Sequence, residues 1–288
     1  MSYLIIVNPH AGNKDNKKVI QQLTEMLHAH HFSYVLKYTT KTRDAEEFAK
    51  EAREKTIIVA GGDGTVNEVV NGIMQNSLKP RLAILPIGTS NMLARALKIP
   101  SNVKKAIAII AENRRKDFDL GFLHGNQKYF AIGCGVGLDA VAYKNVEPKI
   151  KKFFGEIAYP ISFLQTLFNY EPKELIVKNE GKEYKAYYVL VLNTAKFTNF
   201  LELAKKSSNH DGYLDVLLFS KKDIISQFKY LVGLITKQHT RFNDIVSLKV
   251  KKIEIECDEK VLVHTDAEIA GTTPIIIEVK QHAIEVVC

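Results

Sequence analysis

Short apolar runs alternate with segments of helical hydrophobic period over the first 113 residues. The apolar runs, each followed by a turn rich in Gly, Asn, Pro or Thr, are at residues 3–7, 34–38, 57–59 and 81–85. Helices are expected between and after them, at residues 17–31, 44–55, 65–73, 92–98 and 103–113. This alternation predicts a doubly wound α/β domain with a parallel sheet, in which a ligand lies beyond the carboxyl ends of the strands.

The pattern changes near Arg115, after which strand-like runs follow one another without intervening helices. These runs are at residues 118–123, 128–132, 174–178, 184–192, 214–219, 247–256 and 260–265. Short turns at 124–126 and 179–181 connect neighbouring runs, which is typical of antiparallel hairpins. The sequence therefore predicts a nucleotide-binding-type α/β domain at residues 1–124 and an antiparallel β-sandwich domain at residues 125–274.

The most informative stretch is residues 56–73, where a β-branched run breaks at Gly61, Gly62 and Gly64 before a helical period begins. Such a strand, glycine turn and helix start let backbone N–H groups approach a phosphate. An acidic residue in this turn would repel the phosphate unless a cation lay between them, so Asp63 indicates Mg²⁺ bound with a nucleotide. The alternative is a tight turn in which the glycines serve only the backbone.

Two segments of the α/β domain resemble the diacylglycerol kinase catalytic-domain family of lipid kinases. Gly61-Gly62-Asp63-Gly64-Thr65-x-Asn67-Glu68 resembles the family's nucleotide signature, although its first five residues are shared with NAD kinases. Gly88-Thr89-x-Asn91-x-x-Ala94-Arg95 resembles the second nucleotide segment and favours the lipid kinases, with Met92 where the family usually has Asp. The resemblance implies ATP contacts from Asn8, Thr39, Gly61, Gly62, Asp63, Gly64, Thr65, Asn67, Glu68, Gly88, Thr89 and Asn91. For Asn8 and Thr39, helix capping and satisfaction of a turn are the alternatives.

A loop in the β-rich part, His210-Asp211-Gly212-Tyr213-Leu214-Asp215, resembles the family's Asp-Gly-x-Leu-Asp loop. The resemblance implies a structural Mg²⁺ held by the Asp211 carboxylate, with backbone carbonyls of Ser208 and Tyr213. Such oxygen ligands suit a hard cation. The alternative is an Asp-Gly turn that needs no metal.

The segment from His264 to Glu268 stands where the family carries Asp-Gly-Glu. The resemblance implies that Asp266 and Glu268 act on the acceptor hydroxyl as general base and helper, with Asp63 as the third catalytic residue, near the metal. Ala267 replaces the usual glycine, and a positive φ there would be strained. The alternative is a pair of solvated acids after a strand. Homologues often have a glycine-rich stretch after the residue equivalent to Asn193, and its absence leaves the lipid head group open.

Composition adds the expected compartment and partners. The chain has 288 residues, 46% hydrophobic and 25% charged, and no apolar run of 18 residues. Its first residues are expected to form a strand rather than a leader, and its three widely spaced cysteines indicate a reducing cytosol. A net charge of +8 favours anionic partners. Basic and aromatic residues interleave at 144–154 and 223–241, which predicts peripheral binding to an anionic membrane, with ordinary packing as the alternative.

Together these features predict a cytoplasmic, ATP- and Mg²⁺-dependent lipid kinase that acts on a lipid at the membrane surface. Diacylglycerol is the expected acceptor, residues 275–288 are expected to return to the first domain as in the family, and no nucleic acid is expected as a partner. A homodimer is left open. The alternative functions are an NAD kinase-like enzyme and a regulator that binds lipid or nucleotide without catalysis.

Overall fold

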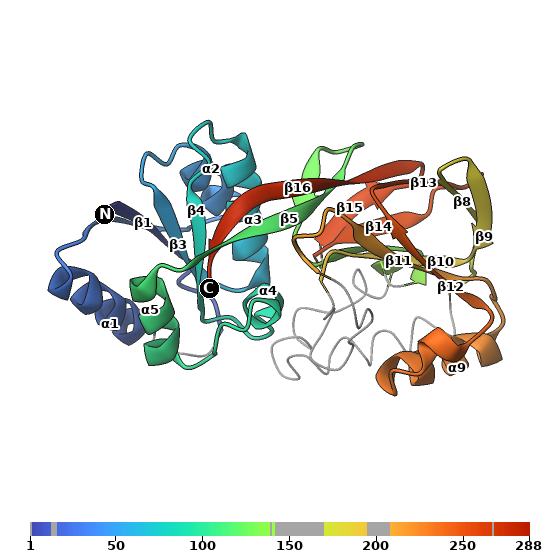
Figure 1. The fold of residues 1–288 in the computed structure, drawn as a ribbon, viewed down its shortest axis with the longest axis horizontal. Helices are drawn as coiled ribbons and strands as arrows, with labels where there is room; N and C mark the ends of the chain where they lie inside the picture. Colours follow the sequence, from blue (N-terminus) through green and yellow to red (C-terminus); the bar gives the residue numbers. More distant parts are fainter. Residues whose placement is uncertain (1, 13–15, 139, 142–169, 195–207, 267) are drawn as a thin grey trace. The chain divides into compact units, whose positions relative to one another are not determined.

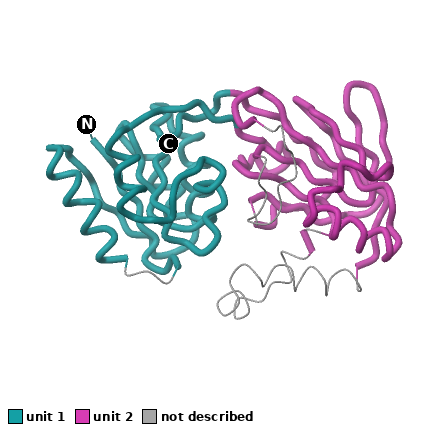
Figure 2. The backbone as a smooth tube through the Cα atoms, turned by 60° about the horizontal axis from the view of Figure 1, so that its bottom comes forward, with its two compact units in different colours: residues 1–119, 282–288 teal, residues 120–281 magenta. Residues whose placement is uncertain are grey.

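A computed structural model describes residues 2–12, 16–138, 140–141, 170–194, 208–266 and 268–288. The chain divides into two compact units (Figure 2). The first unit holds Met1–Asp119 and His282–Cys288, and the second holds Leu120–Gln281. Both divisions fall inside strands, namely β5 (Arg115–Leu123) and β16 (Ile275–Val287), so each of these strands contributes residues to both units.

The first unit is built on a parallel sheet with the strand order β2-β1-β3-β4, and the end of β16 pairs parallel to β4 (Figure 1). Its strands are β1 (Ser2–Val7), β2 (Ser33–Tyr38), β3 (Thr56–Gly61) and β4 (Arg81–Pro86). Its helices are α1 (Asn16–Ala29), α2 (Asp44–Lys50), α3 (Asp63–Gln75), α4 (Met92–Ala96) and α5 (Val103–Glu112). All six residues of β3 are buried, because helices cover both faces of the sheet.

The second unit is a sandwich of antiparallel strands. One sheet has the order β12-β11-β10-β7-β14-β15, formed by β7 (Gly133–Val136), β10 (Tyr188–Leu192), β11 (Leu214–Phe219), β12 (Ile245–Val250), β14 (Leu262–Thr265) and β15 (Glu268–Thr272). The other strands are β6 (Lys128–Phe130), β8 (Leu175–Asn179), β9 (Lys182–Ala186) and β13 (Lys252–Glu256), with β5 and β16. One apolar core joins the two layers, with Val191 and Val216 from the first sheet among Ile253 and Ile277 from the second.

This architecture confirms the predicted fold class, a parallel α/β sheet followed by an antiparallel sandwich. Several element boundaries differ from the prediction. The run at 184–192 is two strands, β9 and β10, and the run at 247–256 is β12 and β13, because the chain changes sheets in the middle of each run. The helix predicted at 44–55 ends at Lys50. Strand β7 was not predicted from the sequence, because its two glycines give a weak strand signal although both of its edges are paired.

Candidate active site

The glycine turn between β3 and α3 is an open helix N-terminus. β3 ends at Gly61, Gly62 is the N-cap of α3, and Asp63 is the first helical residue. No side chain caps the helix at Gly62. The backbone N–H groups of a first helical turn have no partners within the helix, and the helix dipole favours negative charge there. This end of α3 can therefore receive an anionic group such as a phosphate.

The second glycine turn lies directly against the first. β3 and β4 are parallel neighbours in which Gly61 is opposite Pro86, and the backbone N–H groups of Ile87 and Gly88 both donate to the Gly61 carbonyl, at 3.3 and 3.2 Å. A Cβ on Gly88 would overlap the Cα of Gly62. The two turns can therefore lie this close because position 88 lacks a side chain, and together they form one carboxyl edge of the sheet.

Asp63 connects this pair of turns to α4. Its Oδ1 accepts a hydrogen bond of 2.6 Å from the backbone N–H of Met92, the first residue of α4. Asn91 before it has a φ of 48°, and its Nδ2 donates to the Gly88 carbonyl at 2.8 Å. The polar contact at position 92 comes from the backbone, so the methionine side chain does not remove it. Thr89 is exposed at the same turn.

Asn8 and Thr39 lie at the ends of the neighbouring strands β1 and β2. Asn8 donates through Nδ2 to the hydroxyl of Thr65 in α3 at 3.0 Å, and its Oδ1 accepts from the N–H of His10 in its own turn at 3.0 Å. Thr39 is buried, and its hydroxyl donates to the Val7 carbonyl at 3.5 Å. In this structure the Thr39 hydroxyl contacts backbone, and Asn8 links its own turn to the start of α3.

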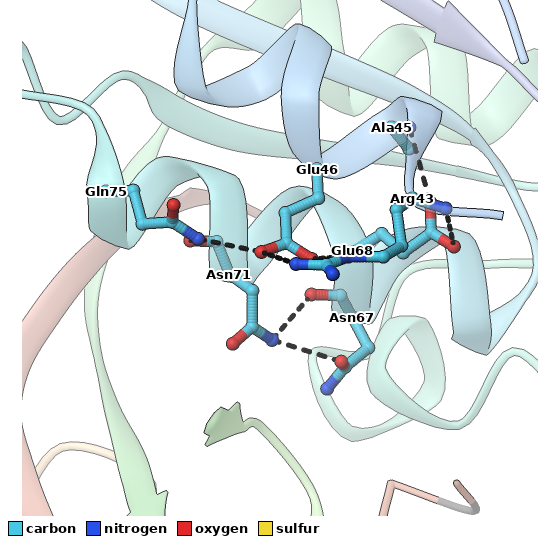
Figure 3. Close-up of polar contacts among 7 residues, drawn as sticks. All are labelled: Arg43, Ala45, Glu46, Asn67, Glu68, Asn71 and Gln75. Atoms are coloured by element: carbon cyan, nitrogen blue, oxygen red, sulfur yellow. Dashed lines mark hydrogen bonds and ion pairs between the residues drawn. The ribbon is translucent and has the colours of Figure 1, made fainter. Parts of the chain in front are cut away.

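Glu68, the last residue of the nucleotide signature, holds α3 against α2, whereas the neighbouring Asn67 contacts Asn71 within α3 (Figure 3). The Glu68 carboxylate accepts hydrogen bonds from the N–H groups of Arg43 at 2.9 Å and Ala45 at 3.2 Å. It thereby caps α2, whose N-cap Arg43 has a left-handed φ of 72° and no side-chain cap of its own. Asn67 is buried and accepts from the Nδ2 of Asn71 at 3.1 Å. The Glu68 side chain therefore positions α2 against α3, and the Asn67 side chain hydrogen-bonds within its own helix.

The contact between α2 and α3 also contains Glu46 and Gly72, two residues that the sequence motifs did not indicate. The Glu46 side chain of α2 is buried, and its carboxylate accepts from Gln75 Nε2 at 2.7 Å and pairs with the Arg43 guanidinium at 3.4 Å. Gly72 of α3 faces the backbone of Glu46 so closely that a Cβ would overlap it. A glycine in the middle of an apolar helix was the available signal, because glycine costs stability there unless a close approach requires it.

In the second unit, Asp266 is a buried carboxylate saturated by backbone amides. Its Oδ2 accepts from Ala131 N–H at 2.7 Å, and its Oδ1 accepts from Ile132 and Gly133 N–H at 2.8 and 3.1 Å. Its own backbone adopts a φ of 45°. Glu268 begins β15 and is exposed. The side chain of Asp266 therefore fixes the segment before β7, whereas that of Glu268 faces solvent.

Asp211 is paired with a lysine. Its Oδ2 accepts from Lys249 Nζ at 2.6 Å, and its Oδ1 accepts from the N–H of Tyr213 at 3.1 Å. The hydrogen bond to Asp211 raises the pKa of the Lys249 ammonium group. Ser208 contributes its hydroxyl to a 2.9 Å hydrogen bond with His210. In this arrangement the Lys249 ammonium group occupies the carboxylate oxygen that would bind the metal. The residues therefore do not fit the Mg²⁺ expected at Asp211 unless Lys249 moves away.

Some predicted features lie outside the described residues. These are the basic and aromatic segment at 144–154, the stretch after Thr194, and Ala267. Within the described part of the chain, no group of three His, Cys, Asp or Glu side chains is arranged to hold a metal ion. No helix among the described residues is long and apolar enough to cross a membrane.

Comparisons with known proteins agree with this arrangement of a phosphate-type turn and a β-sandwich. The diacylglycerol kinase catalytic domain model matches residues 2–123, and the YegS C-terminal NAD kinase beta sandwich-like domain model matches residues 133–288. The diacylglycerol kinase of Bacillus subtilis (strain 168) is 31% identical, covering 94% of this chain and 90% of that protein. The diacylglycerol kinase of Staphylococcus carnosus (strain TM300) is 29% identical, covering 96% of this chain and 92% of that protein.

Solved structures support the same assignment. The crystal structure of a diacylglycerol kinase from Bacillus anthracis str. Sterne is 26% identical, covers 99% of this chain and 96% of that chain, and gives a TM-score of 0.77. A second structure from the same organism is 31% identical with a TM-score of 0.83. The fold and these matches define a phosphotransferase that acts on lipids. The chain belongs to the diacylglycerol kinase family, and it is a lipid kinase.

Proposed function

We propose that this lipid kinase transfers the γ-phosphoryl group of ATP, with Mg²⁺, to the free hydroxyl of diacylglycerol. The observation that carries the proposal is the junction of the two glycine turns at the start of α3, with Asp63 between them. Membership in a kinase family implies the use of ATP. Relatives that match nearly the whole chain are named diacylglycerol kinase, which favours diacylglycerol as the acceptor.

The nucleotide phosphates are proposed to contact the backbone at Gly61, Gly62, Gly64 and Thr65, with Gly88 and Asn91 forming the facing turn. This fits because no side chain caps α3 and because a Cβ on Gly88 would fill the junction. Asp63 supplies the carboxylate oxygen that a hard cation prefers. When bound, Mg²⁺·ATP supplies the phosphoryl group and a charge that neutralises its oxygens.

Asp266 and Glu268 are proposed to serve the acceptor hydroxyl in two different ways. Phosphoryl transfer requires alignment and a proton acceptor more than covalent help. Because backbone amides occupy both oxygens of Asp266, we assign to Asp266 the positioning of the loop and to exposed Glu268 the contact with the acceptor. The kinase is further proposed to work in the cytoplasm as a peripheral membrane protein, since its acceptor is a lipid.

The proposal is tested by phosphate transfer from labelled ATP in mixed micelles that contain diacylglycerol, monoacylglycerol, ceramide or sphingosine, with NAD as a separate acceptor. We expect Mg²⁺-dependent label in diacylglycerol. Label in another lipid would mean that this lipid, and not diacylglycerol, is the acceptor. Label in NAD alone would contradict a lipid substrate. ATP binding without transfer to any acceptor would favour a regulator. Glu268→Gln and Asp266→Asn, compared at equal folded fraction, then separate the two acidic residues, and only a loss of kcat in Glu268→Gln supports our assignment.

A further inference from the structure

Helix α9 (Ile224–Ile235) belongs to the second unit (Figure 1) and carries apolar side chains on two opposite faces. One face is buried and includes Gln227, Tyr230 and Leu234. The Tyr230 ring lies 5.1 Å from the ring of Phe219 in β11. Asp223 caps the helix by accepting from Ser226 N–H at 2.9 Å. The buried face alone explains why the helix packs on the sandwich.

The opposite face carries an apolar stripe that is exposed among the described residues. The stripe comprises Ile224, Ile225, Phe228, Val232 and Ile235, whose exposed fractions run from 42% for Val232 to 79% for Ile225. Residues 225, 228, 232 and 235 are spaced three or four positions apart, so they share one side of the helix. Five of the ten exposed large hydrophobic residues found in the described chain belong to this one helix. A contiguous patch of this kind marks an interaction surface rather than ordinary scatter.

The charges around α9 are predominantly positive. Residues 221–244 contain five basic side chains, all exposed: Lys221, Lys222, Lys229, Lys237 and Arg241. Of the two acidic residues of this segment, Asp223 caps the helix and Asp244 accepts from Lys229 Nζ at 2.9 Å, so the Lys229–Asp244 pair adds no net charge and the segment carries a net charge of +3. No acidic residue lies between them. A second copy of this surface would bring like charges together, whereas anionic phospholipid would complement them.

We propose that α9 is the element with which the enzyme docks on an anionic lipid bilayer. The helix lies in the plane of the interface, its apolar stripe enters the boundary between head groups and acyl chains, and the surrounding basic side chains face the head groups. The inference rests on the proposed function, because a kinase for a bilayer lipid must reach the surface that contains its acceptor. It assigns that contact to one helix and to residues outside the proposed nucleotide and acidic sites.

The test is flotation of the full-length protein with vesicles of phosphatidylcholine alone or of phosphatidylcholine with phosphatidylglycerol. The wild-type protein is expected to bind the anionic vesicles and to release them as salt rises. Ile225→Ser combined with Phe228→Ser should weaken this binding by about tenfold or more, since each removed side chain loses its transfer to an apolar environment. Leu78→Ser is the matched control, because Leu78 is 64% exposed in the first unit, and it should leave binding unchanged.

Thermal unfolding must be similar for all variants, because the substituted side chains are exposed. The proposal would be overturned if the double variant bound anionic vesicles as strongly as the wild type. It would also be overturned if the wild-type protein formed a dimer through α9 and did not bind vesicles. Transfer to a water-soluble short-chain diacylglycerol should be equal in wild type and double variant. If the wild type phosphorylates no lipid but binds vesicles through α9, the proposed function fails while the docking surface stands. If it phosphorylates soluble diacylglycerol but does not bind vesicles, only the docking surface fails.

Discussion

Asp63 and Asp266 are two carboxylates of the predicted catalytic set that have opposite environments. Asp63 is half-buried at an open helix N-terminus, and one of its oxygens accepts the N–H of Met92. Asp266 is 5% exposed, and its two oxygens accept three backbone N–H groups. The first carboxylate stands beside a surface made of glycine backbone, whereas the second organises a buried loop.

The comparison distinguishes a carboxylate that can contact a ligand from a carboxylate whose two oxygens are already hydrogen-bonded within the fold. A buried carboxylate that satisfies several amides cannot be removed without leaving those amides unpaired. A carboxylate at a glycine turn can change with a smaller effect on the fold. We therefore expect substitutions in the two places to act on different observables, stability at Asp266 and nucleotide chemistry at Asp63.

The largest effect on stability is expected for Asp266→Ala. Removing the carboxylate leaves three buried N–H groups without their acceptor, and each costs about 1–3 kcal/mol, so the free energy of unfolding should fall by at least about 3 kcal/mol. Urea denaturation measures it. Glu268→Gln is the exposed control and should change stability by less than about 0.5 kcal/mol. Equal stability of Asp266→Ala and wild type would mean that Asp266 is not a structural centre.

Gly88→Ala tests the junction of the two turns. Its new Cβ would overlap the Cα of Gly62, which should cost about 1–3 kcal/mol in overpacking and weaken Mg²⁺·ATP binding by about tenfold or more through displaced backbone. Calorimetric titration with Mg²⁺·ATP measures the second effect. Gly125→Ala, where a Cβ meets nothing within 4 Å, is the control. Unchanged ATP affinity in a strained Gly88 variant would remove the second turn from the site.

Glu68→Ala distinguishes a positioning residue from a nucleotide contact. The change removes both acceptors at the N-terminus of α2 and should lower stability by about 1 kcal/mol, with a KM for ATP close to that of the wild type. Steady-state kinetics and thermal unfolding measure the two quantities, with exposed Glu47→Ala as the control in α2. A large rise in KM without a loss of stability would restore the direct contact that the motif suggested.

The smallest effect concerns pH. Hydrogen bonds from the backbone N–H of Thr40, then that of Lys41, and from the Thr40 hydroxyl hold the pKa of the Asp44 carboxyl below its usual value. A lowered folded-state pKa stabilises the protein above the unfolded value of about 3.9. This stability is lost as the pH falls through the lower folded value. Wild type should therefore exceed Asp44→Asn in stability near pH 6 and lose that advantage below about pH 4. A constant difference across this range would contradict the assignment.

Periodicity predicted the order of elements in the first unit well, because its strands are buried on both faces and its helices have one apolar stripe. It was weaker in the second unit, where a strand such as β7 contains two glycines and runs such as 247–256 pass from one sheet to the other. The motif located Gly62 and Gly88, whose contact follows from strand pairing. It could not reveal that Glu68 caps α2 or that Lys249 pairs with Asp211, since both depend on partners distant in sequence.

The most direct measurement is transfer of labelled phosphate from ATP to diacylglycerol by wild type and Asp63→Asn at equal folded fraction. Asparagine keeps an oxygen that can accept the N–H of Met92 and removes only the negative charge. We predict Mg²⁺-dependent transfer by the wild type and at least about a hundredfold lower kcat/KM in the variant, or about 2.7 kcal/mol of transition-state stabilisation, with little change in thermal stability. Wild-type protein that transfers no label, or a variant as active as the wild type, would contradict a kinase centre at the glycine turns.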